Sequence, residues 1–413
     1  MDAARRGVMA ALGMLPWGLA AIHAGQDGER PAADPPRELP ATGADLGTAF
    51  ESVARIAAAH ATLPTKRLEP FDRETRDRAR REVLSLLRYQ PPLVPLDPKT
   101  VEQVDCGDYV RERVEFSTTP WFRVAGYVLV PKRTSGRMPA IVDLHSHGGM
   151  FLFGKEKVID LGRNHPTMTQ YHERNYGGRP TATELVRRGY VVISIDAFGF
   201  GERRIMLDED RAHGWDRSRY SPELVQQLNT KCRGKESTIA KSLVLAGSTW
   251  IGLVNYDDRR VVDYLLTRPD VDPDRIGCIG ISMGGYRSAY LAALDERIRA
   301  ACVVGFMSSM SSMLQAHVDT HSWIHFLPGL HGGLDFPDVA SLAAPRALFV
   351  QQCSQDRLFP LAGMRESVET LARRYSAAGA APQFRSKFYD EPHHWTIAMQ
   401  DEAFEWLAER LKG

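Results

Sequence analysis

The chain has 413 residues, enough for one large domain with an extension or for two domains. Its hydrophobic fraction of 43% and charged fraction of 25% are those of an ordinary globular protein. The 52 Lys and Arg residues nearly balance the 51 Asp and Glu residues, so the net charge gives no argument for a nucleic-acid partner.

The first 25 residues have the pattern of an export signal. Arg5 and Arg6 precede an apolar run over residues 8–22, and small residues follow it. The paired arginines suggest the twin-arginine route. The run is short and glycine-interrupted for a membrane span, so we expect a periplasmic or secreted protein with no stable membrane insertion after signal removal. A cytoplasmic protein with an amphipathic or disordered N-terminus is the alternative.

Residues 26–48 are rich in proline, alanine, glycine and charge, which is typical of a linker. Helical spacing follows over residues 49–63 and 71–89, and prolines from Pro91 onward end the second helix. We therefore predict a helical N-terminal extension over residues 49–100.

Strand patterns begin at residue 101. Residues 109–116 and 122–131 predict an antiparallel hairpin. Short apolar strands then alternate with helical patterns, which predicts a mostly parallel sheet covered by helices on both faces. The expected strands cover residues 140–145, 190–196, 276–279, 300–305, 347–351 and 384–389. We therefore assign residues 101–413 to one α/β domain. Two insertions without strand pattern, at about 155–183 and 202–248, are expected to form the substrate pocket or a lid.

The five cysteines contain no C-x-x-C pair, and their number is odd, so at least one has no partner within the chain. We interpret most of them as small buried hydrophobic residues. They are Cys106, Cys232, Cys278, Cys302 and Cys353.

The stretch Gly280-Ile281-Ser282-Met283-Gly284 matches G-x-S-x-G, the nucleophile elbow of α/β-hydrolases. A short apolar strand precedes it and a helical pattern follows it. The glycines are expected because a side chain two residues before or after a strained serine would collide with a neighbouring element. This context predicts that Ser282 is a nucleophile at the N-terminus of a helix.

A serine nucleophile needs a base that is itself oriented by an acid, and in α/β-hydrolases the order along the chain is serine, acid, histidine. Asp356 follows the second strand after the elbow and is the predicted acid. Asp335 and Asp338 lie earlier, in a glycine-rich loop, and are weaker candidates. The base is expected after the last strand, where His393 and His394 are adjacent, and we favour His393 because Trp395 follows at a typical distance.

The oxyanion of a tetrahedral intermediate needs two backbone donors. One is predicted to be the amide of Met283, the residue after the nucleophile. The other is assigned to the amide of His147, with Gly148 as the alternative, because glycines in this loop let the backbone approach a substrate.

Other histidines allow a different interpretation. His145 and His147 form an H-x-H pattern also found in zinc hydrolases, with His172, Asp196 or His213 as further ligands. The glycines that follow and the complete triad argue against it, so no metal and no cofactor are predicted.

A second histidine group and a glycine-rich turn complete the candidates. His317, His321 and His325 share one face of an expected helix, where packing near the pocket is favoured over metal binding. Glu202 and Arg203 follow a turn that lacks the full dinucleotide motif, and one of them is expected to brace the active-site loops.

Taken together, these motifs make the chain from about residue 101 onward similar to the bacterial dienelactone-hydrolase-like and acetyl-xylan-esterase-like branch of the α/β-hydrolases. The resemblance implies a serine carboxyl-ester hydrolase without a cofactor. It rests on residues 145–149, 198–203 and 280–285 together with Asp356 and Pro392-His393. True dienelactone hydrolases use a cysteine nucleophile, and serine at position 282 favours ester hydrolysis instead.

The expected function is cleavage of carboxylic esters through an acyl-enzyme, with an acetyl-esterase-like activity on small-molecule or carbohydrate esters. A serine peptidase or amidase with the same triad is one alternative. A non-catalytic binding protein with this fold is another. The sequence makes no prediction of oligomeric state.

Overall fold

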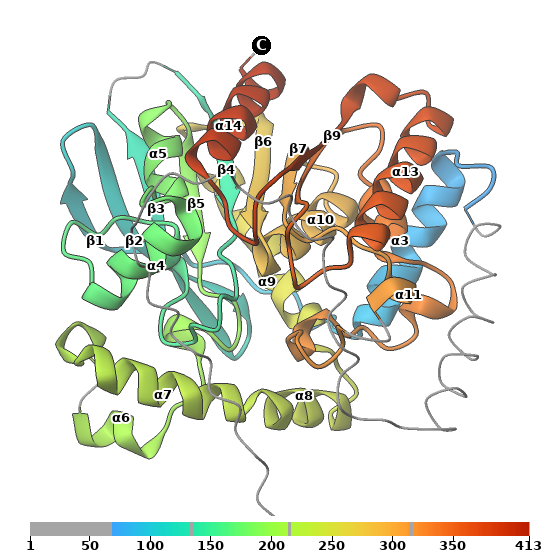
Figure 1. The fold of residues 1–413 in the computed structure, drawn as a ribbon. Coiled ribbons are helices and arrows are strands. Elements are labelled where there is room, and N and C mark those ends of the chain that lie inside the picture. Colours follow the sequence, from blue (N-terminus) through green and yellow to red (C-terminus); the bar gives the residue numbers. More distant parts are fainter. Residues whose placement is uncertain (1–67, 133–135, 214–215, 314–316, 413) are drawn as a thin grey trace, which may run out of the picture. The chain divides into compact units, whose positions relative to one another are not determined.

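The structure is a computed structural model, and it describes residues 68–132, 136–213, 216–313 and 317–412 (Figure 1). The expected export signal, the linker and the first helical segment of the extension lie outside the described residues. The second helical segment is α3 (Arg73–Leu87). Its N-terminus is capped by Asp72, whose carboxylate accepts a hydrogen bond of 2.8 Å from the Thr75 amide.

The described residues form a sheet of nine strands in the order β1-β2-β3-β5-β4-β6-β7-β8-β9. The first three strands and their junction with β5 are antiparallel, and every later pair is parallel. The strands are β1 (Lys99–Asp105), β2 (Tyr109–Thr119), β3 (Phe122–Pro131), β4 (Met138–Asp143), β5 (Val191–Ile195), β6 (Val271–Ile281), β7 (Ile298–Val304), β8 (Ala347–Cys353) and β9 (Phe384–Tyr389).

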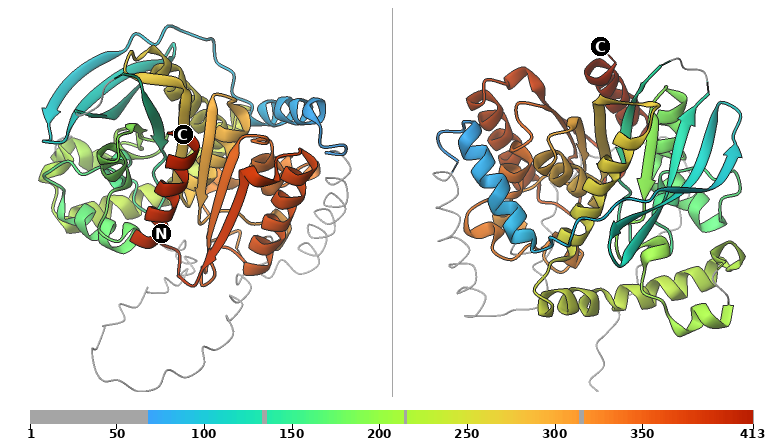
Figure 2. Two further views of the ribbon diagram at one scale, coloured as in Figure 1. Left: turned by 90° about the horizontal axis from the view of Figure 1, so that it is seen from above. Right: turned by 180° about the vertical axis from the view of Figure 1, so that it is seen from behind.

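Helices cover both faces of the parallel part of the sheet, as the sequence predicts. Figures 1 and 2 show α5 and α14 on one face and α9 and α10 on the other. Every residue of β4, β5 and β8 is buried, because parallel strands with helices on both faces have no exposed side. The remaining α-helices are α4 (Pro166–Tyr176), α5 (Thr181–Arg187), α6 (Asp208–His213), α7 (Pro222–Gly234), α8 (Glu236–Leu245), α9 (Trp250–Thr267), α10 (Met283–Leu294), α11 (Met310–Met313), α12 (Phe336–Ser341), α13 (Leu361–Ala377) and α14 (Ile397–Leu411).

The two insertions are helical in the structure. The first contains the 3-10 helix η1 (Lys155–Lys157) and α4, and the second contains α6, α7 and α8. Figure 1 shows α7 and α8 as a nearly continuous rod that passes below the sheet. Only Lys235 separates these two helices.

The prediction of one helix through His317, His321 and His325 is wrong. Residues 317–320 form a turn, and a short 3-10 helix, η4 (Trp323–His325), follows. Ser322 caps η4 by accepting from the Ile324 amide, and this local hydrogen bond competes with helix continuation.

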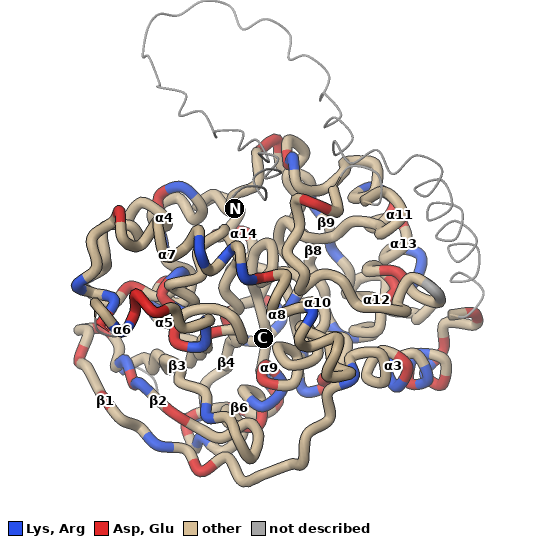
Figure 3. The backbone as a smooth tube through the Cα atoms, turned by 90° about the horizontal axis from the view of Figure 1, so that it is seen from below, with Lys and Arg blue, Asp and Glu red and all other residues tan. Residues whose placement is uncertain are grey.

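Basic and acidic residues are interspersed along the described backbone and do not separate by sign (Figure 3). Many of them form ion pairs, such as Arg113 with Glu202 at 2.9 Å. All five cysteines are free thiols, and four of them are buried.

Within the described residues, no single helix has both the length and the apolar character needed to cross a membrane. One pair, Pro222–Leu245 and Trp250–Thr267, meets that test only when joined across an 85° bend.

Candidate active site

Ser282 lies at a sharp turn between β6 and α10, as the elbow motif predicts. Its backbone has φ 60° and ψ −122°, a conformation that side-chain-bearing residues rarely adopt. The Ser282 amide donates a 2.8 Å hydrogen bond to the Val304 carbonyl at the end of β7. This bond fixes the turn to the neighbouring strand. The side chain of Ser282 therefore leaves the sheet at the first turn of α10.

The two glycines of the motif pack against one carbonyl group. A Cβ atom on Gly280 would lie 2.4 Å from the Leu144 oxygen, and one on Gly284 would lie 1.9 Å from the same oxygen. Real Cβ atoms do not come so close to a backbone atom. The chain leaving β4 therefore passes directly over the serine turn, and this close approach is the physical reason for glycine at both positions.

Asp356 and His393 meet beyond the carboxyl ends of β8 and β9. The Nδ1 of His393 lies 2.5 Å from Oδ2 of Asp356, whose side chain is fully buried. The other carboxylate oxygen accepts a 2.7 Å hydrogen bond from the Leu358 amide. The imidazole of His393 also lies beside Gly305, since a Cβ there would be 3.4 Å from His393 Cε1 and 3.5 Å from Ile281. The ring thus lies next to the backbone that adjoins Ser282.

The neighbouring His394 has different contacts. Its Nε2 lies 2.9 Å from the carboxylate of Glu391, and its side chain is 31% exposed. Trp395 is fully buried after it, with its amide bonded to the Asn175 carbonyl and its indole N–H bonded to the Gln351 side chain. These bonds fix the loop so that His393, and not His394, faces Asp356.

The predicted oxyanion donors lie on the two chain segments that cross at the elbow. Met283 is the first residue of α10, where backbone N–H groups have no intrahelical partner. The loop that carries His147 and Gly148 is held by Lys157, a fully buried side chain of η1. Its ammonium donates to the carbonyls of Ser146 and His147 at 2.8 and 2.9 Å.

Lys157 thereby orients both candidate donors of this loop. In a trans peptide the C=O and the following N–H point in opposite directions. The Ser146 carbonyl shares its peptide plane with the His147 N–H, and the His147 carbonyl shares its plane with the Gly148 N–H. Burial lowers the pKa of Lys157 well below its ordinary value, opposed by the charges of Asp196 and Glu156.

Both histidines of the H-x-H pattern use both ring nitrogens in hydrogen bonds to protein groups. His145 accepts from the Ala197 amide and donates to the Ser146 carbonyl, each at 3.0 Å. His147 accepts from the Gly149 amide at 3.0 Å and donates to the Glu236 carboxylate at 3.1 Å. Burial lowers the pKa of both rings.

The other residues weighed for zinc binding have partners of their own. His172 bonds to the Glu156 carbonyl, Asp196 is paired with Lys155 at 2.7 Å, and the ring of His213 packs against Tyr220. Across the described ranges, no three His, Cys, Asp or Glu side chains are grouped so as to hold a metal ion.

The weaker acid candidates lie at the start of α12. Asp335 forms a capping box with Asp338, and it also accepts from the Met310 amide. Asp338 pairs with Arg374 at 3.1 Å. Burial raises the pKa of Asp335 to about 7. Both carboxylates thus have structural partners.

The turn after β5 has the expected bracing contacts. Glu202 accepts from the fully buried Lys155 at 2.9 Å, and Arg203 pairs with Asp257 at 2.6 Å while donating to the Asp196 carbonyl. The turn is thereby joined to η1 and to α9.

The second insertion contacts the predicted oxyanion loop, which carries His147 and Gly148, through side chains that the sequence patterns do not reveal. Asn229 of α7 accepts from the amides of Phe151 and Leu152. Glu236, the first residue of α8, accepts from His147 and from the Ser322 hydroxyl at 2.6 Å. The pKa of Glu236 is lowered, because these hydrogen bonds outweigh the effect of its burial. Isolated polar residues on an amphipathic helix resemble a solvated face, so no motif could have identified them.

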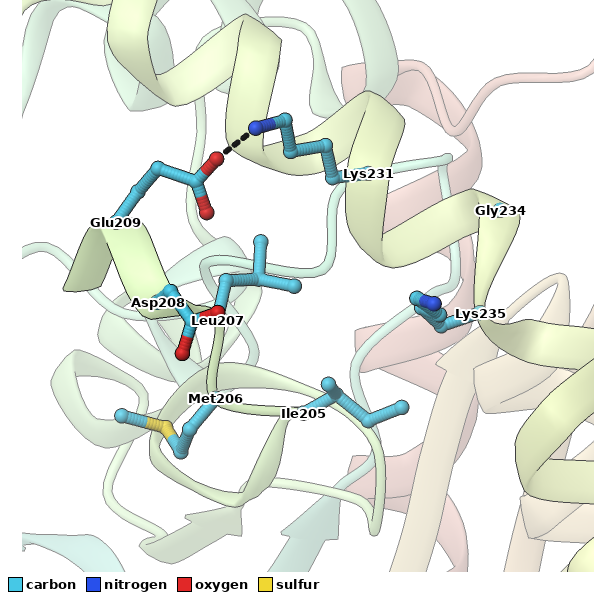
Figure 4. Close-up of a pocket in the computed structure, with 8 residues that line it drawn as sticks. All are labelled: Ile205, Met206, Leu207, Asp208, Glu209, Lys231, Gly234 and Lys235. Atoms are coloured by element: carbon cyan, nitrogen blue, oxygen red, sulfur yellow. Dashed lines mark ion pairs between the residues drawn. The ribbon is translucent and has the colours of Figure 1, made fainter.

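A cavity of about 480 Å³ lies within the second insertion (Figure 4). An ion pair between Lys231 and Glu209 spans it. None of the predicted site residues contributes to it. Its lining consists of Ile205, Met206, Leu207, Asp208, Glu209, Lys231, Gly234 and Lys235.

The sequence profile of the Abhydrolase family matches residues 66–396 of this chain. The chain belongs to this family. The protein named "Putative hydrolase YtaP" of Bacillus subtilis (strain 168) is 29% identical over 340 residues, which cover 80% of this chain and 98% of that protein.

Solved structures with the same fold include proteins described as esterases. A putative acetyl xylan esterase from Bacteroides fragilis NCTC 9343 superposes with a TM-score of 0.61 at 19% identity, over 86% of each chain. A glucuronoyl esterase from Solibacter usitatus gives a TM-score of 0.53 at 14% identity, over 80% of this chain and 91% of that one. At these identities the likeness shows the α/β-hydrolase fold and does not transfer a substrate.

Proposed function

We propose that this protein hydrolyses carboxylic esters through an acyl-enzyme formed on Ser282. The observation that carries the proposal is the contact between Asp356 and His393. The imidazole of His393 also adjoins the strained turn that carries Ser282. A strained serine, a histidine and a buried carboxylate from three separate segments are what nucleophilic catalysis requires.

In the proposed reaction, Nε2 of His393 accepts the Ser282 proton while Oγ attacks the ester carbonyl carbon. Asp356 accepts from Nδ1–H and so holds the ring in the tautomer that leaves Nε2 free to act as base. The same imidazolium then gives its proton to the leaving alcohol. Water repeats the sequence on the acyl-enzyme and releases the acid, which restores Ser282.

We assign stabilisation of the negative charge that develops on the carbonyl oxygen to the amides of Met283 and His147, with Gly148 as the alternative second donor. Support comes from the first-turn position of Met283 and from the lysine that orients the peptide planes on both sides of His147. Preformed donors of this kind need no rearrangement when the charge appears.

The substrate class proposed here is a small or carbohydrate ester, with acetate as the favoured acyl group. The Bacteroides fragilis and Solibacter usitatus proteins share the fold and are described as a putative acetyl xylan esterase and a glucuronoyl esterase. Fold similarity alone supports this choice, so the activity has to be measured.

Export is a second proposal that rests on residues 1–25. Expression of the full chain in a Gram-negative host followed by N-terminal sequencing of the periplasmic form tests it. Cleavage near residue 25 supports export, and a full-length cytoplasmic product contradicts it.

The test of the proposed function is a substrate panel assayed with the wild type and with Ser282→Ala. The panel contains p-nitrophenyl esters of increasing chain length, acetylated xylo-oligosaccharides and the p-nitroanilide that matches the best ester. We expect the acetyl esters to be cleaved, the anilide to be a poor substrate, and Ser282→Ala to lose turnover by on the order of 10⁵–10⁶. Preference for the anilide would favour an amidase, and an active Ser282→Ala variant would overturn the mechanism.

A further inference from the structure

Two histidines outside the triad lie together beside it. His321 precedes η4 and His325 is its last residue, and their ring centroids are 5.5 Å apart. His321 packs on Phe359 at 4.7 Å, and Phe359 in turn lies 6.1 Å from the ring of His393. On the other side, His325 packs on Tyr286 of α10 at 4.7 Å. His321 and His325 therefore lie between the loop that carries His393 and α10, the helix that begins at the elbow.

The hydrogen bonds of these rings fix which nitrogen carries the proton. Nδ1 of His321 lies 2.7 Å from the His317 carbonyl, and Nδ1 of His325 lies 3.3 Å from the Ser322 carbonyl. A carbonyl only accepts, so each Nδ1 donates. In a neutral ring each Nε2 then has a lone pair and acts as an acceptor.

Both Nε2 atoms are buried and have no hydrogen-bond partner among the residues that the structure describes. His325 is only 6% exposed. Burial lowers the pKa of His321 to about 4 and that of His325 well below its usual value, so both rings are neutral near pH 7. A buried acceptor without a donor is unfavourable, and each such group in a folded protein calls for an explanation.

The two rings also lie within electrostatic range of both halves of the reaction centre. His393 contributes to the lowered pKa of His321, and His147 contributes to that of His325. Next to them, Trp323 is 45% exposed although its side chain is aromatic and apolar. Exposed aromatic faces beside polar groups are typical of ligand-binding surfaces.

We propose that His321 and His325 form a hydroxyl-binding pair that receives O–H groups of a polyhydroxylated ester substrate, with Trp323 supplying an apolar face for its sugar ring. The inference rests on the proposed ester hydrolysis at Ser282 and specifies the substrate beyond it. An ester group has no hydrogen to donate, whereas sugar hydroxyls do, so a polyhydroxylated substrate is the kind that matches these two acceptors.

The structure around the pair supports a substrate role over a packing role. Packing alone is served equally well by phenylalanine, since Phe306 already stacks with His325 and Phe359 meets His321 edge to face. Imidazoles in place of benzene rings add only the two unpaired Nε2 acceptors and the Nδ1 donors that aim them. Those donors hold each ring in one orientation.

The experiment combines enzyme variants with paired substrates. A mono-acetylated methyl xyloside with free hydroxyls is compared with the same ester whose other hydroxyls are methyl ethers, and with p-nitrophenyl acetate. The enzymes are the wild type, His321→Phe, His325→Phe and the corresponding Gln variants. Glutamine places an oxygen acceptor near the position of Nε2, so it serves as the conservative control.

We expect the wild type to prefer the free-hydroxyl ester, and each Phe variant to lose about tenfold in kcat/KM on that ester alone, mainly through KM. Turnover of p-nitrophenyl acetate should stay within about threefold, and Gln should recover part of the loss. Equal losses on all three esters, or an unchanged hydroxyl preference in both Phe variants, would overturn the assignment.

Binding of xylobiose, followed by ligand-observed NMR, separates this inference from the proposed reaction. Xylobiose should bind the wild type and Ser282→Ala alike, and should bind both Phe variants more weakly. If p-nitrophenyl acetate and the sugar esters are not cleaved but this binding pattern holds, the proposed function fails and the hydroxyl-binding pair stands. If esters are cleaved and xylobiose binds the Phe variants as well as the wild type, only the pair is refuted.

Discussion

Two regions border the carboxyl edge of the sheet, and they are held in place by different means. Every residue of α10, the helix after the elbow, is buried, and the turn before it is fixed by backbone groups. In α8 only Ala240 is buried, and Leu245 at its end is 91% exposed. The helix is tied to the site through the side chain of Glu236.

This difference indicates a division of tasks. Nucleophile, acid and donors need positions accurate to a fraction of an ångström, and backbone bonds within a buried core supply that accuracy. Segments with few buried contacts open at lower free energy and tolerate sequence change. We therefore expect the α7–α8 insertion and the 317–326 segment to determine substrate choice, while the elbow and the triad loops determine rate.

The largest expected effect concerns the adjacent histidines. His393→Ala should lower kcat on p-nitrophenyl acetate by on the order of 10⁵ or more, because the triad acts as a unit. His394→Ala should remain within about tenfold, since its ring contacts Glu391 and not Asp356. A dead His394→Ala beside an active His393→Ala would make His394 the base.

The next effect concerns the oxyanion loop. Lys157→Met should lower kcat by about 10²–10³ with little change in KM, comparable to the loss of one oxyanion donor. Lys155→Met is the matched control, because Lys155 pairs with the carboxylates of Asp196 and Glu202 and not with the oxyanion-loop carbonyls. Lys155→Met should lower the free energy of unfolding, and its effect on kcat should be smaller than that of Lys157→Met. Equal kinetic effects of the two variants would refute a positioning role for Lys157.

Replacing one glycine by alanine in each region tests how tightly the two regions are packed, through the free energy of unfolding. Gly284→Ala places a Cβ against the Leu144 carbonyl and should cost at least about 1–3 kcal/mol in the free energy of unfolding. Gly234 ends α7, and a Cβ there meets no atom within 4 Å. Gly234→Ala should therefore stabilise the protein by about 0.5–1 kcal/mol. Urea denaturation measures the free energy of unfolding of both variants. A Gly284→Ala variant as stable as the wild type would show that the elbow has room for a Cβ atom.

A further expected effect is a dependence of stability on pH that arises from His321. Its folded-state pKa of about 4 lies below the unfolded value of 6.5, so between these values the unfolded chain binds the additional proton. Stability should therefore fall as the pH drops from 6.5 to 4, by about 3 kcal/mol from this group. The ring packs against His325, and the charges of His317, His393 and Asp356 modulate its pKa after the larger effect of burial. Urea denaturation of His321→Phe at pH 7 and 4.5 should show a smaller decrease than the wild type, and an equal decrease would contradict it.

The sequence predicts the elbow and α10, which backbone groups hold in place, better than the α7–α8 insertion and the 317–326 segment, which side chains hold. The strand–turn–helix around Ser282 and the strands at β4–β9 follow from glycine spacing and apolar runs, which reflect local conformation and burial. The expected helix through His317 and His325 was wrong, because a serine cap and ring packing override helical spacing there. The contacts of Lys157 and Glu236 join segments far apart in the chain, and no local pattern encodes them.

The proposed mechanism requires Ser282 to be the activated nucleophile of this site. Labelling with a fluorophosphonate probe, followed by peptide mapping, tests it most directly in the wild type and in Ser282→Ala. We expect one equivalent of probe on the peptide that contains Ser282, no labelling of Ser282→Ala, and strongly slowed labelling of His393→Ala. Stoichiometric labelling at another residue, or labelling that persists in Ser282→Ala, would contradict it.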